Sequence, residues 1–134
     1  MVDIRWKQRF SNLEKAFSQF TEFIEKGELN KFELQGLIQC FEYNFELGWK
    51  TMKDYLENEG YTLNTPRETI KTAFSVNLIV DGALWLEALE KRNLMSHTYE
   101  ESVAILVGED ITKKYYPMIK ELYLKLKEET NHGR

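Results

Sequence analysis

Residues 31–59 read KFELQGLIQCFEYNFELGWKTMKDYLENE, and their large apolar side chains recur every three or four residues. This spacing places them on one face of a helix, because an α-helix completes a turn in about 3.6 residues. The members of this stripe are Leu34, Ile38, Phe41, Phe45, Trp49, Met52 and Leu56. Asn30 is suited to cap the start of the helix, and Gly60 is suited to end it. Such an aromatic stripe is typical of a core or a dimer surface rather than of a cofactor site.

Two further long segments flank this stretch and carry the same pattern. The first ends near Gly27 and has an apolar seam made of Trp6, Phe10, Leu13, Phe17, Phe20 and Ile24. The second runs from about Glu100 to about Glu129 and has an inward face made of Val103, Val107, Ile111, Tyr115, Met118, Leu122 and Leu126. Pro117 lacks an amide hydrogen and crowds the carbonyl group of Lys113, so we expect this last helix to kink or split there.

Two shorter helices are predicted between these long segments. The run TPRE at residues 65–68 combines an N-cap threonine, a first-turn proline and a glutamate three residues after the threonine, which predicts a short helix to about Phe74. Residues 75–81 form a connection that is apolar enough to pack over the other helices. Asp81 is suited to cap the next helix, expected over residues 82–96. The segments together predict an all-α fold, an antiparallel up-and-down four-helix bundle with an extra short helix.

The composition limits the class of protein. The 134 residues are 43% hydrophobic and 30% charged, which predicts a single folded domain over residues 1–134, with a flexible tail at residues 130–134. A net charge of −4 argues against a broad basic surface for nucleic acids, so any RNA contact would be local. Cys40 is the only cysteine, and no Cys/His spacing resembles a zinc site, so no metal or cofactor is expected. The apolar runs are too short to span a membrane and no signal-peptide pattern is present, which predicts a cytoplasmic protein.

The candidate reactive stretch is RNLMSHTY at residues 92–99, which contains the only histidine outside the C-terminal tail. If the helix before it continues, Arg92 and Tyr99 fall on one line that begins apolar, while Asn93 and His97 share the neighbouring line. A guanidinium on that line needs a counter-charge or an anionic ligand. Glu42 and Glu46 flank the apolar face of the 31–59 helix, and we select Glu46 as the candidate partner of Arg92. From the residues alone, an ordinary arrangement is favoured over a reactive site, with the arginine paired to a carboxylate and the histidine satisfied or solvated.

The pattern Arg-x4-His-x-Tyr, present as Arg92, His97 and Tyr99, resembles the signature of HEPN-domain proteins, specifically the HepT-like toxins. These proteins are also called the nucleotidyltransferase substrate-binding protein family, and they are partners of minimal nucleotidyltransferases (MNT). The runs FELGWKTMKDYL at residues 45–56 and TPRE at residues 65–68 resemble the same family. The resemblance covers roughly residues 41–100, and it implies the same helical bundle and a homodimer with the motif near the shared interface.

The resemblance implies a metal-independent ribonuclease and assigns roles to the motif. Cleavage of RNA through its own 2′-hydroxyl group needs proton transfer, which His97 can perform, and charge stabilisation at phosphate, which Arg92 can provide. Asn93 would orient His97 or the phosphate. A single histidine cannot easily serve as both base and acid, so a dimer that joins two motifs makes chemical sense. In the family, the tyrosine that matches Tyr99 receives adenylate from the partner nucleotidyltransferase, which silences the toxin.

Two alternatives stay open at this stage. The chain could be a non-catalytic subunit that binds a substrate or nucleotide for a separate nucleotidyltransferase, with Arg92 and His97 lining an anion pocket. It could also be a pure assembly module. A small nucleotidyltransferase encoded nearby would favour the ribonuclease and the binding subunit over the assembly module, and an activity assay would separate the first two.

Overall fold

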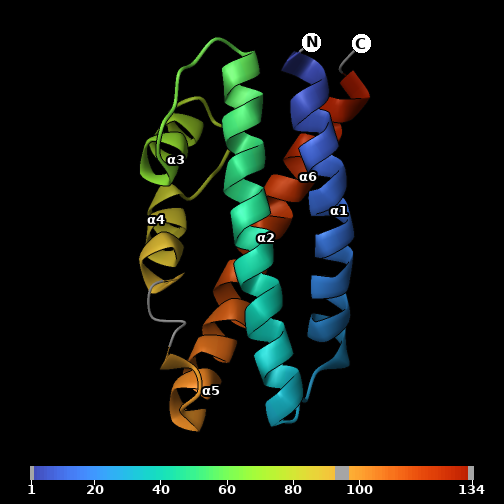
Figure 1. Cartoon of the computed structure of the whole chain (residues 1–134), viewed down its shortest axis with the longest axis vertical. Coiled ribbons are helices and arrows are strands. Elements are labelled where there is room, and N and C mark those ends of the chain that lie inside the picture. The colour runs from blue at the N-terminus through green and yellow to red at the C-terminus, as the bar shows by residue number, and fades with distance from the viewer. Residues whose placement is uncertain (1, 93–96, 133–134) are drawn as a thin grey trace.

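The computed structural model describes residues 2–92 and 97–132, and this part of the chain is helical and contains no strand (Figure 1). Its elements in chain order are α1 (Val2–Lys26), α2 (Lys31–Asn58), α3 (Pro66–Ser75), α4 (Gly82–Lys91), α5 (Glu101–Asp110), the π-helical segment η2 (Ile111–Tyr115) and α6 (Tyr116–His132). The start of α1 and the end of α6 lie at the same end of the molecule (Figure 1). The predicted all-α bundle is confirmed.

Helices α1 and α2 form an antiparallel pair that supplies most of the aromatic core. The predicted seams face each other, and their fully or almost fully buried members are Trp6, Phe10, Leu13, Phe17, Phe20, Ile38, Phe41, Phe45, Met52 and Leu56. Asn30 caps α2 as expected, because its side chain accepts hydrogen bonds from the backbone N–H groups of Phe32 and Glu33 at 2.9 and 2.8 Å. The Glu33 carboxylate accepts one in return from the N–H of Asn30, which completes a capping box.

The third long segment is one helix interrupted in its middle, with α5 before the interruption and α6 after it. Pro117 has no amide hydrogen to donate to the carbonyl of Lys113, and the backbone widens just before it into η2, where the N–H of Tyr116 donates to the carbonyl of Ile111. The predicted break at Pro117 is therefore confirmed, and it takes the form of a π-helical turn. The Tyr116 ring stacks on Phe17 of α1 at 5.2 Å between ring centres.

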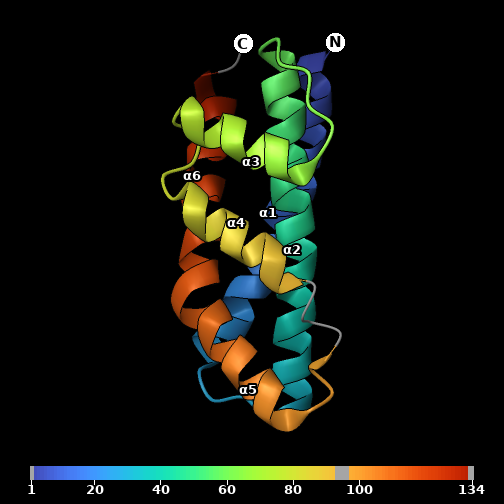
Figure 2. The same ribbon diagram turned by 90° about the vertical axis from the view of Figure 1, so that its left-hand side faces the viewer.

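The short helices α3 and α4 follow each other along the flank of α2 (Figure 2). Each starts at the predicted cap: Thr65 accepts from the N–H of Glu68, and Asp81 accepts from the N–H of Leu84. In the connection between them Leu78 and Ile79 are buried, as expected, whereas Val80 is exposed. Helix α4 buries Trp85 beside Gly48 of α2, where a Cβ atom would lie 3.3 Å from the indole ring. The absence of a side chain at residue 48 therefore lets α4 approach α2 closely.

The structure tests one of two predicted helix ends. The α-helical part of α4 ends at Lys91, and the N–H of Arg92 bonds to the carbonyls of Ala88 and Glu90, whereas the end expected near residue 96 lies outside the described residues. The expected end of the last helix near Glu129 was wrong. Helix α6 continues to His132, so residues 130–132 of the expected tail are helical. The hydroxyl group of Thr130 donates to the carbonyl of Lys127, and no glycine or proline occurs between Pro117 and Gly133.

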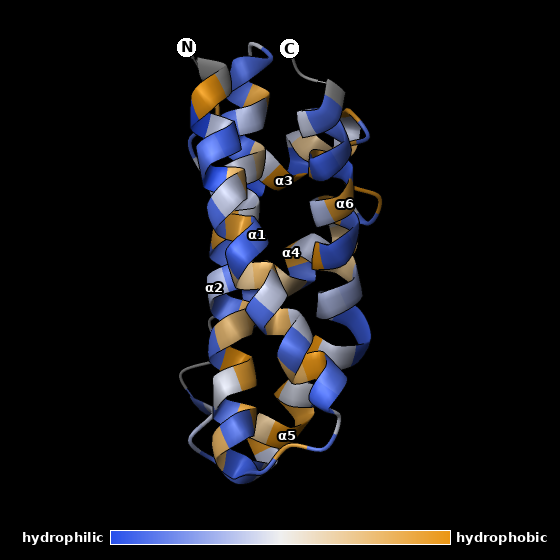
Figure 3. Ribbon diagram, turned by 90° about the vertical axis from the view of Figure 1, so that its right-hand side faces the viewer, coloured by the Kyte–Doolittle hydropathy of each residue, from blue (hydrophilic) through white to orange (hydrophobic). Residues whose placement is uncertain are grey.

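Helix α5 is apolar on more than one side. Ala104 and Val107 are buried against the bundle, but Ile105 and Leu106 on the other side are 48% and 64% exposed. Figure 3 shows the same property, since apolar residues colour much of the α5 ribbon. A surface helix in a bundle normally carries polar residues on its outer side. The outer side of α5 is therefore suited to contact with another apolar surface.

Candidate functional site

Arg92 lies directly after α4 and forms an ion pair with Glu46 in the middle of α2. The same carboxylate accepts a hydrogen bond of 3.2 Å from the indole N–H of Trp49, and the ammonium group of Lys50 lies 3.7 Å from it. The Arg92 guanidinium also lies 6.0 Å from the centre of the Phe45 ring. The contact expected between Arg92 and Glu46 is therefore present. Because about a third of each side chain is exposed, a phosphate could reach the guanidinium in competition with Glu46.

Glu42, the other flanking glutamate, has a different environment. Burial raises the pKa of its carboxyl group above the usual range. It lines a shallow cavity on the outer side of α2 together with Tyr43 and Glu46. Arg92 contacts Glu46, one turn further along α2, so the structure distinguishes between the two glutamates that the sequence offered.

A second set of contacts fixes the end of α4 that carries Arg92. The ammonium group of Lys91 lies 3.1 Å from the Asp110 carboxylate, and the hydroxyl group of Tyr115 donates a 2.7 Å hydrogen bond to Glu87. This bond is the main reason why the pKa of Glu87 lies below its usual range, while burial and the carboxylate raise the pKa of Tyr115. The last two turns of α4 are thus attached to the end of α5 and to η2, which holds the backbone of Arg92 in place.

His97 and Tyr99 belong to a turn outside any long helix, closed by a 3.2 Å hydrogen bond from the N–H of Glu100 to the carbonyl of His97. Both side chains are exposed, and their ring centres are 6.2 Å apart. Thr98 between them is buried, and its carbonyl accepts a 2.7 Å hydrogen bond from the side-chain amide of Gln35. The motif's histidine and tyrosine are therefore brought together beside the first turns of α2.

The line expected to join Arg92 and Tyr99 required the helix to continue as far as Tyr99, and this condition is not met, because Tyr99 lies in a turn. Arg92 contacts α2 at Glu46, whereas the turn after it contacts α2 at Gln35, eleven residues earlier in the sequence. Eleven helical residues span about 16 Å. Within one chain, Arg92 and the turn that carries His97 therefore contact α2 at two positions that are well separated along its axis. Asn93 lies outside the described residues, and its role stays a prediction.

A cavity of about 610 Å³ lies between the turn that carries Tyr99 and the first turn of α2. It is lined by Lys31, Phe32, Leu34, Gln35, Thr98, Tyr99, Glu101 and Ala104. Sequence reasoning missed Phe32 and Gln35 because neither belongs to the apolar stripe of α2. The one local signal was an aromatic residue placed off that stripe.

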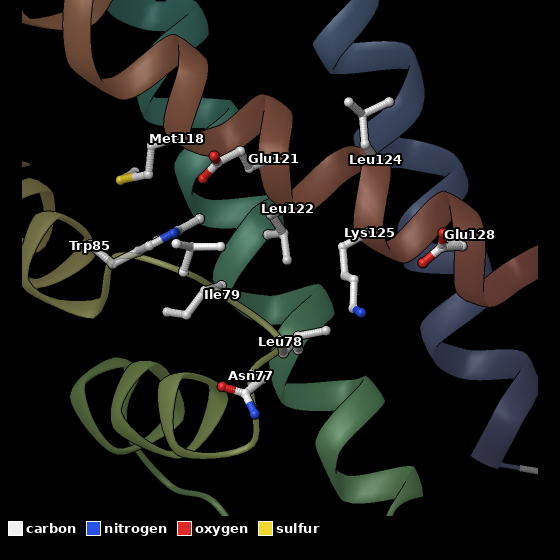
Figure 4. A pocket seen from close by; sticks show the side chains of 11 residues that line it. Asn77, Leu78, Ile79, Trp85, Met118, Glu121, Leu122, Leu124, Lys125 and Glu128 are labelled. Carbon is white, nitrogen blue, oxygen red and sulfur yellow. The ribbon is translucent and has the colours of Figure 1, made fainter.

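A further cavity of about 360 Å³ lies between the α3–α4 connection and α6 (Figure 4). Leu78, Ile79, Trp85 and Leu122 provide its apolar wall, and Lys125 extends from α6 at its rim. None of the described motif residues lines it. The chemistry suggested by the motif therefore concerns the α2 side of α4 and the turn that follows, not this cavity.

Residues 2–92 and 97–132 contain no cluster of three or more histidine, cysteine or carboxylate side chains that could hold a metal ion. No helix in this part of the chain has the length and hydrophobicity needed to cross a membrane. Cys40 is a free thiol on α2, and burial raises its pKa above the usual range.

The sequence and the fold of this chain are similar to those of known proteins. The chain is 28% identical to the "Probable ribonuclease HepT" of Haemophilus influenzae, over 75% of this chain and 80% of that protein. A crystal structure of a Thermus thermophilus protein superposes with a TM-score of 0.78 at 31% identity, covering 85% of this chain and 98% of the other.

The fold also matches HI0074 of Haemophilus influenzae, which is described as the fold of a substrate binding domain of a nucleotidyltransferase. That match has a TM-score of 0.66 at 23% identity and covers 95% of this chain and 99% of the other. The family model described as "Nucleotidyltransferase substrate binding protein like" matches residues 8–128. The chain therefore belongs to the nucleotidyltransferase substrate binding protein-like family, which includes HepT-like proteins.

Proposed function

We propose that this chain is the HepT-like component of a toxin–antitoxin pair and that it cleaves RNA without a metal ion. The observation that carries the proposal is the arrangement of the motif: Arg92 is held at the end of α4 by Glu46, and His97 is exposed on a turn anchored to α2. The relative named as a probable ribonuclease supports the same activity. The single cysteine and the lack of a disulfide framework support action in the cytoplasm.

The proposed reaction uses the RNA's own 2′-hydroxyl group as the nucleophile. This oxygen bonds to phosphorus as the bond between phosphorus and the 5′-oxygen breaks, which leaves a 2′,3′-cyclic phosphate and a 5′-hydroxyl. The 2′-hydroxyl group loses a proton and the leaving oxygen gains one, and imidazole is suited to both transfers near neutral pH. Arg92 stabilises the negative charge on the phosphoryl oxygens through its several N–H donors. Asn93 would orient the imidazole or the phosphate.

The complete site is proposed to form in a homodimer. In one chain Arg92 contacts α2 at Glu46, whereas Thr98, the residue after His97, contacts α2 at Gln35, about three turns away. One imidazole also cannot easily be base and acid in the same step. A two-fold axis would bring a second copy of each group to the same phosphate. The exposed Ile105 and Leu106 on α5 give the second chain an apolar surface close to the turn that carries His97.

The proposed partner is a small MNT-type nucleotidyltransferase, and Tyr99 is the proposed site at which it attaches adenylate. The Tyr99 side chain is 76% exposed, so the phenol oxygen is accessible to another protein. Its ring lies 6.2 Å from that of His97, so an attached phosphate would lie near the imidazole and repel the phosphate of RNA. One modification would thus block the site and change its charge.

An assay with modified RNA tests the reaction itself. The purified protein is incubated in EDTA with an RNA that it cleaves and with the same RNA carrying a 2′-deoxy substitution at the mapped cleavage position. The proposal expects cleavage of the first, with 2′,3′-cyclic phosphate ends, and no cleavage at the substituted position. Cleavage that survives the substitution, or that requires an added divalent metal, would contradict the mechanism. Binding of RNA or nucleotide without any turnover would instead indicate a binding subunit.

A further inference from the structure

The cavity of about 610 Å³ beside the motif has walls from three different parts of the chain. Lys31 and Phe32 come from the first turn of α2, Thr98 and Tyr99 from the motif turn, and Glu101 and Ala104 from the start of α5. Its volume lies within the range typical of small-ligand sites. Because it adjoins His97 through Tyr99, a ligand here would lie next to the proposed reaction centre.

Two aromatic rings at this cavity are largely exposed. Phe32 and Tyr99 each leave 76% of their accessible surface uncovered, more than other large apolar residues of the described chain. Neither ring is needed to fill the core. Exposed aromatic faces at a cavity offer flat apolar surfaces on which a planar ring can stack. The cavity is therefore suited to a ligand with an aromatic ring.

The two walls that carry these rings are fixed without any ligand. Gln35 bonds to the Thr98 carbonyl at 2.7 Å, which holds the turn that carries Tyr99. Asn30 caps the first turn of α2 and so fixes the backbone of Phe32. A ligand would lose less free energy in ordering these walls than it would in ordering mobile segments.

The charges at the cavity are placed on opposite sides. The ammonium group of Lys31 lies 5.4 Å from the centre of the Phe32 ring, so a cation adjoins the proposed stacking surface. The N–H groups of Phe32 and Glu33 already donate to Asn30, so an anion here would bind to the lysine side chain rather than to the helix terminus. Glu101 on the α5 side would repel an anion. A ligand with an aromatic ring and one phosphate group fits this distribution.

We propose that this cavity is a nucleobase site, in which a base stacks on Phe32 and Tyr99 while its phosphate lies towards Lys31 and His97. The inference deepens the proposed function, because it assigns the residues that contact a base beside the reacting phosphate. The base can come from an RNA substrate or from a free nucleotide supplied to Tyr99. Both sources present the same stacking chemistry.

Calorimetric titration of the purified protein with AMP tests the base site, and ribose 5-phosphate is the matched ligand without a base. Saturation-transfer NMR identifies which AMP protons touch the protein. We expect AMP to bind measurably more tightly than ribose 5-phosphate, with the strongest transfer to the adenine protons. Phe32→Ala should weaken AMP binding about tenfold or more, whereas Phe32→Tyr should retain it. Tyr61→Ala removes an exposed ring that does not line this cavity and should leave binding unchanged.

Three results would overturn the inference: no AMP binding at millimolar concentration, equal binding of ribose 5-phosphate, or equal loss in Phe32→Ala and Tyr61→Ala. Parallel titration with single-stranded RNA separates the two sources of the base. Loss of both AMP and RNA affinity in Phe32→Ala assigns the site to RNA, and loss of AMP affinity alone assigns it to a free nucleotide. AMP binding does not require turnover, so a protein that binds AMP through Phe32 but cleaves no RNA would refute only the ribonuclease proposal.

Discussion

The side-chain amide of Gln35 donates a 2.7 Å hydrogen bond to the backbone carbonyl of Thr98, which lies 63 residues further along the chain. This bond joins the second turn of α2 to the turn that presents His97 and Tyr99. Thr98 itself is buried, so its carbonyl has little access to water as an alternative partner. The amide of Gln35 thus helps to fix the turn that presents the two exposed rings against α2.

Replacing Gln35 should impair activity more than it impairs folding. Gln35→Ala should lower the free energy of unfolding by only about 1 kcal/mol, the typical contribution of one hydrogen bond, while the turn with His97 loses this bond to α2. Urea unfolding and RNA cleavage rates measure the two effects. Gln39→Ala, one turn further along α2 at an exposed position, is the matched control. Equal cleavage rates in the two variants would show that the bond does not position the turn.

The bond between Tyr115 and Glu87 should make stability depend on pH at both extremes. Burial raises the pKa of Tyr115 in the folded state, so its contribution is complete below the ordinary tyrosine pKa of about 10 and is lost as pH rises through the raised value. The pKa of Glu87 is lowered, so its contribution is present above the ordinary glutamate pKa of about 4.3 and is lost as pH falls through the lowered value.

Tyr115→Phe should therefore destabilise the protein by about 1 kcal/mol at pH 7. Above about pH 10 the difference from the wild type should shrink, because the unfolded wild type gains ionised Tyr115 and the variant cannot. Urea unfolding at pH 7, 9 and 10.5 measures this. Tyr61→Phe, at an exposed phenol, serves as the control. A difference that stays constant across these pH values would mean that Tyr115 ionises alike in the folded and unfolded states.

The exposed side of α5 should hold two chains together. Light scattering should find a dimer at micromolar concentration for the wild type and a monomer for Leu106→Glu, because a charge would be buried in an apolar contact. Leu106 is 64% exposed in the single chain, so the substitution should not disturb the fold. Leu124→Glu, at a 53% exposed position on α6, should remain dimeric. A monomeric wild type would contradict the proposal that the complete site forms in a homodimer. A dimeric Leu106→Glu would show that the interface lies elsewhere.

Tyr99 should acquire adenylate when the chain is produced together with its proposed nucleotidyltransferase partner. Intact-mass spectrometry should find one or more added adenylate groups, and peptide mapping should locate them on Tyr99. Tyr99→Phe lacks the acceptor oxygen and should stay unmodified, whereas Tyr43→Phe removes another exposed phenol and should be modified like the wild type. An unmodified chain in a stable complex with an active transferase would contradict the proposed silencing.

Local signals in the sequence predicted most of the fold. Asn30, Thr65 and Asp81 cap the helices that they were expected to cap, because capping depends on residues three or four positions apart. The break before Pro117 was predictable for the same reason. The end of α4 at Lys91 was not, since no glycine or proline marks it.

The candidate site was predictable only in part, because its two contacts with α2 differ in kind. Arg92 continues an apolar line and needs a counter-charge, so a glutamate at the edge of the facing stripe was a reasonable expectation, and Glu46 is that partner. The bond from Gln35 to Thr98 and the exposure of Phe32 depend on how α2 meets a turn far away in the sequence. No periodicity within either segment encodes them.

The central claim is that His97 performs proton transfer in metal-independent RNA cleavage. Its most direct test is the single-turnover cleavage rate in EDTA for the wild type, His97→Ala and the matched surface variant Arg67→Ala, whose arginine forms an exposed 3.8 Å ion pair with Glu90. Loss of a general acid or base should slow cleavage by about 10²- to 10⁴-fold in His97→Ala, with Arg67→Ala unchanged. A His97→Ala protein that stays folded and cleaves at the wild-type rate would contradict the account.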